Sequence, residues 1–188
     1  MTFKKKIVLI TGAESGIGKS TSKIFLNNNF RVIGTSLKKN KDKYIKDFDN
    51  YQIDITNNIE WRELASIIRK KYSKIDVLVN SAGVRLSGNL ETTTMNDWSY
   101  HLNNNITGTF LSCKHILPLL KKAKNSSIIN LASINSVRGV KNMLAYATSK
   151  SAIISFTASL ALDLSKHNIR VNAVAPGAID TPMLASFK

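Results

Sequence analysis

The chain has 188 residues, 43% of them hydrophobic, and its 27 Lys and Arg against 12 Asp and Glu give a formal net charge of +15. This length fits one domain, and this composition is that of a globular protein, which excludes extended disorder. The lone cysteine, Cys113, excludes an intrachain disulfide and fits a reducing compartment, so we expect a cytoplasmic location.

Apolar runs alternate with amphipathic stretches along the chain. The first run, residues 7–10, is β-branched and apolar throughout, as in a strand buried on both faces. The other expected strands are residues 32–35, 51–53, 76–79, 127–131 and 169–175. The expected helices are residues 17–28, 58–72, 97–122 and 145–166, with a kink or break in the third near Pro118. This alternation predicts a three-layer, doubly wound α/β fold of the Rossmann type, with about six parallel strands and helices on both faces.

A glycine-rich loop lies between the first strand and the first helix. Its spacing, G-x-x-x-G-x-G, departs from the general dinucleotide fingerprint G-x-G-x-x-G. Glycines let the backbone turn tightly and approach phosphates, which the N–H groups of a helix start attract. A tight structural turn would also use glycines. We expect the pyrophosphate of a dinucleotide to be bound by Gly12, Glu14, Ser15, Gly16, Ile17 and Gly18.

The end of the second strand bears on the identity of the cofactor. The general fingerprint places an acid about 20 residues after the glycines, where it binds the ribose 2′-hydroxyl. Here the chain reads Ser36, Leu37, Lys38 and Lys39, with no acid. Lysines at this place can pair with a 2′-phosphate, although they can also simply solvate a loop. We therefore expect NADP, with NAD as the alternative.

Tyr146 and Lys150 are four residues apart in the helix expected over residues 145–166. This spacing places both side chains on one helix face. A free phenol has a pKa of about 10, and a neighbouring ammonium lowers it by favouring the phenolate. Tyr146 can then donate or accept a proton in carbonyl or alcohol chemistry. The pair is common in unrelated helices and gains meaning only beside other motifs.

Several motifs occur together in a fixed order. The glycine loop is followed by Asn-Ser-Ala-Gly at residues 80–83, by Ser133, by the Tyr146–Lys150 pair and by Pro-Gly at residues 176–177. In this combination the sequence resembles the short-chain dehydrogenase/reductase family from about residue 6 to residue 183. The resemblance implies a parallel doubly wound sheet with a nicotinamide cofactor across the carboxyl edge of its strands.

The resemblance also implies four catalytic roles. Tyr146 matches the general acid/base, and Lys150 matches the residue that lowers its pKa and hydrogen-bonds the nicotinamide ribose. Ser133 matches the serine that orients and polarises the substrate oxygen. Asn105 matches the asparagine that holds a water in the proton relay, although an asparagine there can also brace its helix.

Cofactor-binding positions follow from the same resemblance. Asp54 and its neighbour Ile55 match the adenine contact, the 80–83 turn matches the contact with the adenosine ribose, and the 176–181 stretch holds the nicotinamide carboxamide. An amide at position 80 can alternatively tie strands together. Outside the glycine loop, the implied cofactor-binding residues are Ser36, Leu37, Lys38, Asp54, Ile55, Asn80, Ala82, Gly83, Tyr146, Lys150, Pro176, Gly177, Ile179 and Thr181.

We therefore expect an NAD(P)-dependent oxidoreductase that interconverts a carbonyl and a secondary alcohol by hydride transfer. Family members usually continue into a lid, a helix and a seventh strand, so the resemblance implies a single domain over residues 1–188 that lacks these parts. A non-catalytic dinucleotide-binding or regulatory protein is the alternative that this difference motivates.

The expected partners are a small carbonyl or alcohol substrate and further copies of the chain, as a dimer or tetramer. The basic charge invites a nucleic-acid partner, but aromatic residues are not interleaved with the lysines, so none is expected. No apolar run reaches the roughly 18 residues of a membrane span, so no membrane partner is expected. The three histidines lack metal-ligand spacing, and no metal is expected.

Overall fold

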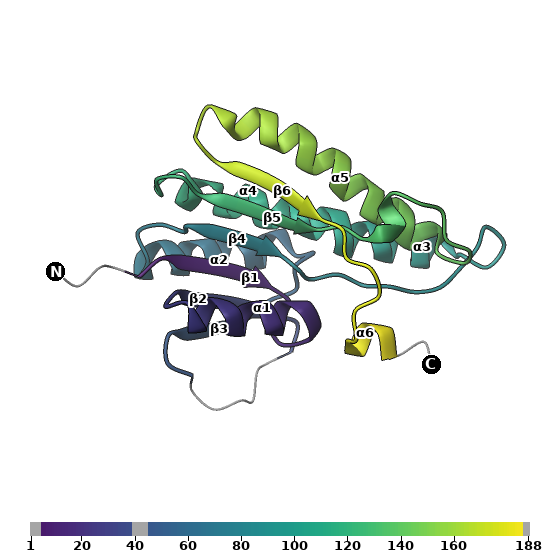
Figure 1. The fold of residues 1–188 in the computed structure, drawn as a ribbon, viewed down its shortest axis with the longest axis horizontal. Coiled ribbons are helices and arrows are strands. Elements are labelled where there is room, and N and C mark those ends of the chain that lie inside the picture. The colour runs from purple at the N-terminus through teal and green to yellow at the C-terminus, as the bar shows by residue number, and fades with distance from the viewer. Residues whose placement is uncertain (1–4, 39–44, 186–188) are drawn as a thin grey trace.

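Six parallel strands form one sheet in the order β3-β2-β1-β4-β5-β6 (Figure 1). A computed structural model describes residues 5–38 and 45–185 of the chain. The strands are β1 Ile7–Thr11, β2 Arg31–Ser36, β3 Phe48–Gln52, β4 Val77–Asn80, β5 Ser127–Leu131 and β6 Arg170–Val174. The predicted doubly wound parallel sheet is confirmed. Its strand order reverses between β1 and β4, where ligands bind in sheets of this kind.

Helices cover both faces of the sheet. The long helices are α1 Gly16–Asn27, α2 Asn58–Lys71, α4 Gly108–Leu120 and α5 Leu144–Ser165, and the short elements are α3 Met95–His101, η1 Leu102–Thr107, η2 Ile134–Ser136 and α6 Pro182–Ala185. Successive residues of β1 point to opposite faces. Val8 and Ile10 pack toward Phe25 of α1, whereas Leu9 belongs to the larger cluster around Trp61 of α2. Among the described residues, no helix has the length and apolarity that crossing a bilayer requires.

The helix expected over residues 97–122 is irregular, but not where proline predicts. Pro118 lies inside α4 without ending it, and the irregularity is instead the π-helical segment η1 between α3 and α4. Pro118 and Lys114, four residues earlier, are both exposed, so water can reach the carbonyl that the proline leaves without a helical partner. The expectation of a break near Pro118 was therefore wrong, and the kink given as its alternative stays a prediction.

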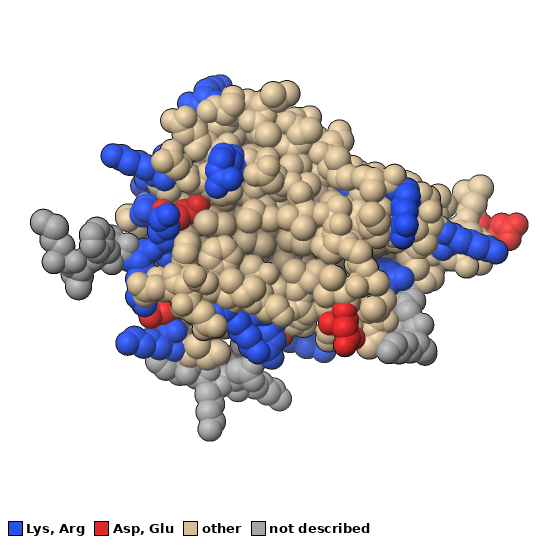
Figure 2. Space-filling model, viewed as in Figure 1, with Lys and Arg blue, Asp and Glu red and all other residues tan. Residues whose placement is uncertain are grey.

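Basic side chains are dispersed over the face of the molecule shown in Figure 2, and no single patch covers its centre. Three basic residues, Arg69, Lys70 and Lys71, lie in the last turn of α2. Cations at the carboxyl end of a helix stabilise it by interacting with the helix dipole. Part of the high net charge thus stabilises the end of α2.

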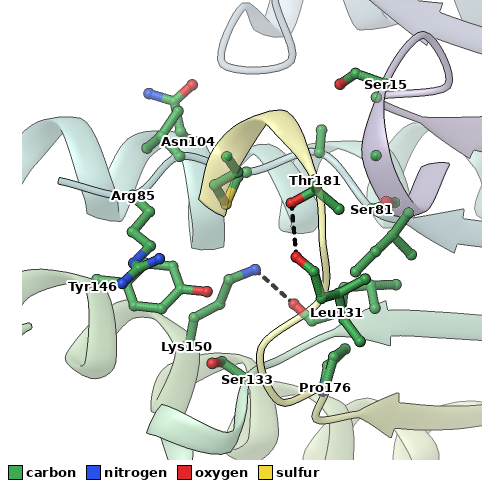
Figure 3. Close-up of a pocket in the computed structure, with 18 of the residues that line it drawn as sticks. Ser15, Ser81, Arg85, Asn104, Leu131, Ser133, Tyr146, Lys150, Pro176 and Thr181 are labelled. Atoms are coloured by element: carbon green, nitrogen blue, oxygen red, sulfur yellow. Dashed lines mark hydrogen bonds between the residues drawn. The ribbon is translucent and has the colours of Figure 1, made fainter. Parts of the chain in front are cut away.

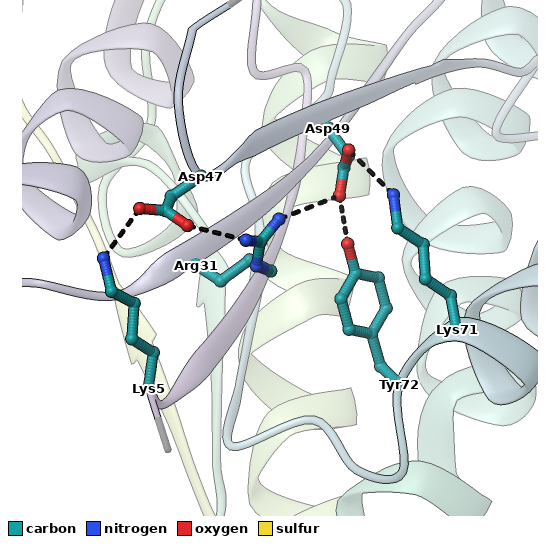
Figure 4. A network of polar contacts seen from close by, with 6 residues as sticks. All are labelled: Lys5, Arg31, Asp47, Asp49, Lys71 and Tyr72. Carbon is teal, nitrogen blue, oxygen red and sulfur yellow. Dashed lines mark hydrogen bonds and ion pairs between the residues drawn. The ribbon is translucent and has the colours of Figure 1, made fainter. Parts of the chain in front are cut away.

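An ionic network joins the amino-terminal ends of β1, β2 and β3 (Figure 4). Asp47 accepts from Lys5 at 2.7 Å and from Arg31 at 2.6 Å. The guanidinium of Arg31 also lies 3.6 Å from Asp49, which is in the edge strand β3. The hydrogen bond from Lys5, with the charges of Lys5 and Arg31, outweighs the opposing effect of burial and holds the pKa of the Asp47 carboxyl below its usual value.

Asp49 is the member of the network that links β3 to α2. Its carboxylate accepts from Lys71 at 2.9 Å and from the hydroxyl of Tyr72. Burial raises the pKa of Asp49, but the hydrogen bonds from Tyr72 and Lys71 more than offset that effect, so the net pKa is lowered. The charged form of this side chain therefore stabilises the folded edge of the sheet.

We predict that Asp49→Asn lowers the free energy of unfolding at pH 7 by about 0.5–1 kcal/mol, the range for partly exposed ion pairs. Because the folded-state pKa is depressed, the contribution is present above the unfolded pKa and is lost as pH falls through the folded value. Urea denaturation at pH 7 and pH 3 measures both, with the exposed Asp163→Asn as control. An equal loss at both pH values would contradict the ionic origin.

Candidate functional site

The carboxyl ends of the strands open into one large pocket of about 730 Å³. Every strand contributes to it through the segment that follows. Most of the residues expected from the sequence line it: Gly12, Glu14, Ser15, Gly16, Ile17, Ser36, Leu37, Asp54, Ile55, Ala82, Gly83, Ser133, Tyr146, Lys150, Pro176, Gly177, Ile179 and Thr181. Four expected residues do not line it: Gly18, Lys38, Asn80 and Asn105.

The glycine loop has a geometry that side chains would prevent. Gly12 and Gly16 have φ angles of +66° and +48°, in the left-handed region that favours glycine. A Cβ on Gly18 would lie 2.2 Å from the carbonyl oxygen of Gly12, so this glycine acts on the shape of the loop rather than on a ligand. The side chain of Ser15 does not cap α1, and the first turn of α1 holds no acidic residue. The start of α1 is therefore suited to bind an anion.

The end of β4 is tied closely to the end of β1. The Thr11 hydroxyl accepts hydrogen bonds from the backbone N–H groups of Ser81 and Ala82, each at 3.0 Å. A Cβ on Gly12 would stand 3.0 Å from the Cα of Ala82. The backbone of the 81–83 turn thus lies directly against the glycine loop.

Asn80 itself turns away from the pocket. Its buried amide donates to Asn130 of β5 at 2.8 Å and accepts from Ser112 of α4. Asn130 continues the chain of hydrogen bonds to Thr157 of α5 at 2.9 Å. The Asn80 side chain therefore links β4 to its neighbours, while the following residues face the ligand space.

The end of β2 carries no carboxylate at residues 36–38. The Ser36 hydroxyl is buried, donates to the carbonyl of Lys38 at 2.8 Å and accepts from Asn50 at 2.8 Å. Leu37 is 64% exposed and lines the pocket. The Lys38 side chain is exposed beside it, and Lys39 lies outside the described residues.

Tyr146 and Lys150 lie one turn apart on α5 and face the same part of the pocket as Ser133 (Figure 3). Both side chains are buried, with 8% and 6% of their surface exposed. The Lys150 ammonium donates to the carbonyl of Leu131, at the end of β5, at 2.7 Å. Burial lowers the pKa of Lys150 to about 8. An ammonium held at this depth is positioned to act on a group inside the pocket.

Ser133 begins the short helix η2 directly after β5. Its hydroxyl oxygen accepts from the N–H of Asn135 at 3.2 Å, and its own N–H donates to Ser136 at 3.1 Å. The next residue, Ile134, donates to the carbonyl of Pro176 at 2.9 Å, which ties this turn to the segment after β6. Ser133 is thus held at the pocket wall. Among the described residues, its hydroxyl hydrogen has no acceptor.

Asn105 lies in the π-helical segment, near Lys150 but outside the pocket lining. Its side-chain oxygen accepts from the N–H of Val84 at 2.8 Å. Its amide nitrogen donates to the Val84 carbonyl at 3.0 Å and to the Ser149 hydroxyl at 2.8 Å. Only Gly83 separates it from Lys150, since a Cβ there would lie 2.9 Å from the Asn105 oxygen and 3.4 Å from the lysine nitrogen.

Sequence patterns missed two residues that the structure brings to this end of the pocket. Arg85, two residues after the Asn-Ser-Ala-Gly motif, lines the pocket with Tyr146. His101 is 1% exposed, and its ring centroid lies 6.3 Å from that of Tyr146. Neither follows a motif spacing, and proximity to the motif was the only signal for Arg85. The described residues contain no cluster of three or more potential metal ligands.

Comparison with known proteins places this geometry in a family. Residues 6–188 match the sequence profile of a family described as short chain dehydrogenase. The 3-oxoacyl-[acyl-carrier-protein] reductase FabG of Thermotoga maritima is 38% identical over 97% of this chain and 78% of that protein. The 3-ketodihydrosphingosine reductase of Bacteroides thetaiotaomicron is 36% identical over 95% of this chain and 66% of that protein.

Solved structures agree with these sequence relatives. The ligand-free aldohexose dehydrogenase of Thermoplasma acidophilum superposes with a TM-score of 0.92 at 33% identity, covering 98% of this chain and 71% of its own. ElxO with NADP bound superposes with a TM-score of 0.91 at 36% identity, covering 97% of this chain and 77% of its own.

We predict that Gly18→Ala weakens the binding of a nicotinamide dinucleotide at least about tenfold, because the added methyl group displaces the Gly12 carbonyl and misaligns the N–H groups of the loop. Gly139→Ala is the matched control, since no atom lies within 4 Å of its added Cβ. Cofactor fluorescence titration measures both variants. Unchanged affinity in Gly18→Ala would show that the loop does not hold the cofactor.

Proposed function

This chain belongs to the short-chain dehydrogenase family and is an NAD(P)-dependent oxidoreductase, and we propose that Tyr146, Lys150 and Ser133 carry the proton chemistry by which it interconverts a carbonyl and a secondary alcohol. The observation that carries the proposal is that these three residues line the same pocket as the glycine loop. The alternative of a non-catalytic binding protein is not favoured, since the relatives are named as reductases and dehydrogenases.

The proton steps follow from the arrangement of the three side chains. A bound nicotinamide supplies or takes the hydride. In the reducing direction Tyr146 donates its phenolic proton to the oxygen of the former carbonyl, and in the oxidising direction it removes that proton. Ser133 donates a hydrogen bond to the same oxygen and stabilises its developing negative charge. The Lys150 ammonium stabilises the phenolate that Tyr146 leaves behind.

The same pocket suits a dinucleotide along its other half. The glycine loop and the start of α1 would hold the pyrophosphate, Asp54 would contact adenine, and residues 176–181 would hold the carboxamide. NADP is the proposed cofactor, with NAD as the alternative, because no carboxylate stands at residues 36–38 and the exposed Lys38 directly follows Leu37, which lines the pocket. Structural relatives are bound to NADP in one case and to NADH in another.

Asn105 acts in this proposal through the backbone that it holds. Its side-chain hydrogen bonds go to Val84 and Ser149, so it fixes the wall of the pocket beside Lys150.

Self-association as a dimer or tetramer is proposed on the outer surfaces of α4 and α5, which expose Phe110 and Leu162. A cytoplasmic location stays a prediction from the lone cysteine.

We predict that Tyr146→Phe lowers turnover of ketones and aldehydes by about 10²–10⁴-fold, the usual worth of a general acid or base, and lowers cofactor affinity far less, because the aromatic ring that lines the pocket is kept. Oxidation of NADPH or NADH with a panel of such compounds measures the first, and fluorescence titration the second. Tyr100→Phe, which removes a hydroxyl from another residue lining the pocket, is the control and should stay active. Absence of turnover by the wild-type chain with every compound would refute the proposed function.

We predict that Leu37→Asp shifts cofactor preference toward NADH by at least about tenfold, because a carboxylate there accepts from a ribose 2′-hydroxyl and repels a 2′-phosphate. Leu37 is exposed, so the change leaves the core intact. Lys38→Ala should lower NADPH affinity without improving that for NADH. The ratio of kcat/KM for the two cofactors is the measurement, and an unchanged ratio in both variants would place the 2′ position elsewhere.

A further inference from the structure

The two halves of the pocket carry opposite charges. The carboxylates among its described lining residues are Glu14, in the glycine loop, and Asp54, which follows β3 in the chain. Both belong to the half proposed for the cofactor. The charged lining residues shown beside Tyr146 are Arg85 and Lys150, which are both positive, and the third basic lining residue is Arg138, in the segment after η2. Lys150 has a role in the proposed proton chemistry, whereas the reaction of a neutral carbonyl compound gives the two arginines none.

Arg85 is held in place by a pair of buried side chains from one stretch of helix. On one side of it, Asn105 bonds both the N–H and the carbonyl of Val84, at 2.8 and 3.0 Å. On the other side, the N–H of Leu86 donates to Nε2 of His101 at 2.9 Å. His101 and Asn105 are four residues apart, so both reach this loop from the same direction.

The hydrogen bonds of His101 assign its tautomer. Its Nδ1 lies 2.7 Å from the carbonyl of Asp97 and must carry the hydrogen, because Nε2 accepts from Leu86. The ring is buried and packs near Tyr146. The backbone on both sides of Arg85 is therefore rigid, and the side chain that it presents to the pocket is anchored at a defined point.

We propose that Arg85, with Arg138 as a further basic residue of the pocket lining, binds an anionic group of the substrate, so that the enzyme acts on carbonyl compounds or alcohols that carry a carboxylate. This inference rests on the proposed function and adds a substrate class to it. A guanidinium presents five N–H donors in a planar fork that matches a carboxylate. With five donors, one arginine can contact the protein and a carboxylate together.

The position of Arg85 suits a substrate contact better than a general surface charge. Figure 3 shows its side chain reaching into the pocket on the side of Tyr146. Arg85 is half-buried, so a carboxylate bound there loses part of its water and gains a stronger interaction. Arg138 is exposed beyond η2 and would act mainly on the approach of the anion.

The test compares acids with their uncharged twins. The compounds are 2-oxo-, 3-oxo- and 4-oxopentanoate, each beside its methyl ester, so that the distance between carbonyl and carboxylate varies while the chain stays constant. The proteins are the wild type, Arg85→Gln, Arg85→Lys and, as a control, Arg69→Gln on the exposed side of α2. The first readout is kcat/KM with NADPH.

We expect the wild type to prefer the acid over its ester at least tenfold at one of the three spacings. Arg85→Gln should lower kcat/KM for that acid by about tenfold to hundredfold, the effect of losing a charge-assisted hydrogen bond, and should change that for the ester less than threefold. Arg85→Lys should retain part of the preference, and Arg69→Gln all of it. Equal use of acids and esters by the wild type at every spacing would overturn the inference.

An equal loss for acid and ester in Arg85→Gln would also overturn it, because the arginine would then act on Tyr146 or on the fold. In that case the pH profile for the ester would shift in the variant.

A second readout separates the inference from the proposed function. Calorimetric titration of the same acids and esters into protein saturated with NADP⁺ measures binding without turnover.

If no compound is turned over but an acid binds at least tenfold more tightly than its ester, and only when Arg85 is present, the anion site stands and the proposed function fails. If acid and ester bind equally, or neither binds, the anion site is overturned whatever the turnover shows.

Discussion

The close approach of the backbone at the ends of β1 and β4 is the constraint on which the site depends. Thr11 accepts two N–H groups of the 81–82 turn, and Gly12 leaves no room for a side chain against Ala82. The parallel register pairs Thr11 with Asn80, so both strands end at one level. At this crevice the strand order reverses, and the glycine loop meets the segment after β4. One junction therefore brings the proposed pyrophosphate site and the proposed substrate wall together.

The segment after β4 is held from its other side by polar side chains rather than by apolar packing. Asn80 bonds to β5 and α4, and Asn105 bonds to both backbone groups of Val84. Each of these two buried amides has hydrogen-bond partners on both its oxygen and its nitrogen, which makes each partner's position specific. The π-helical segment is part of this device, since Asn105 lies within it.

Much of the fold could be predicted, because its signals are local in sequence. Apolar β-branched runs mark the strands to within a few residues, and the glycine spacing and the Tyr146–Lys150 pair mark parts of the site. What could not be predicted depends on partners far along the chain. The π-helical turn forms where Asn105 reaches Val84, 21 residues away. The inward orientation of Asn80 depends on Asn130, 50 residues on. Arg85 follows no motif spacing at all.

The buried ammonium of Lys150 shows how the two halves of the pocket depend on each other. Burial disfavours its charge and lowers its pKa to about 8, so at neutral pH the protein holds a buried cation, which donates to the carbonyl of Leu131. Negative charge arriving in the pocket stabilises that cation, whether as a phosphate, a phenolate at Tyr146 or a substrate anion near Arg85. By linkage, the cation favours each of these anions in return. The positive charges of Lys150 and Arg85 thus suit the phenolate and the substrate anion that we propose for this half of the pocket.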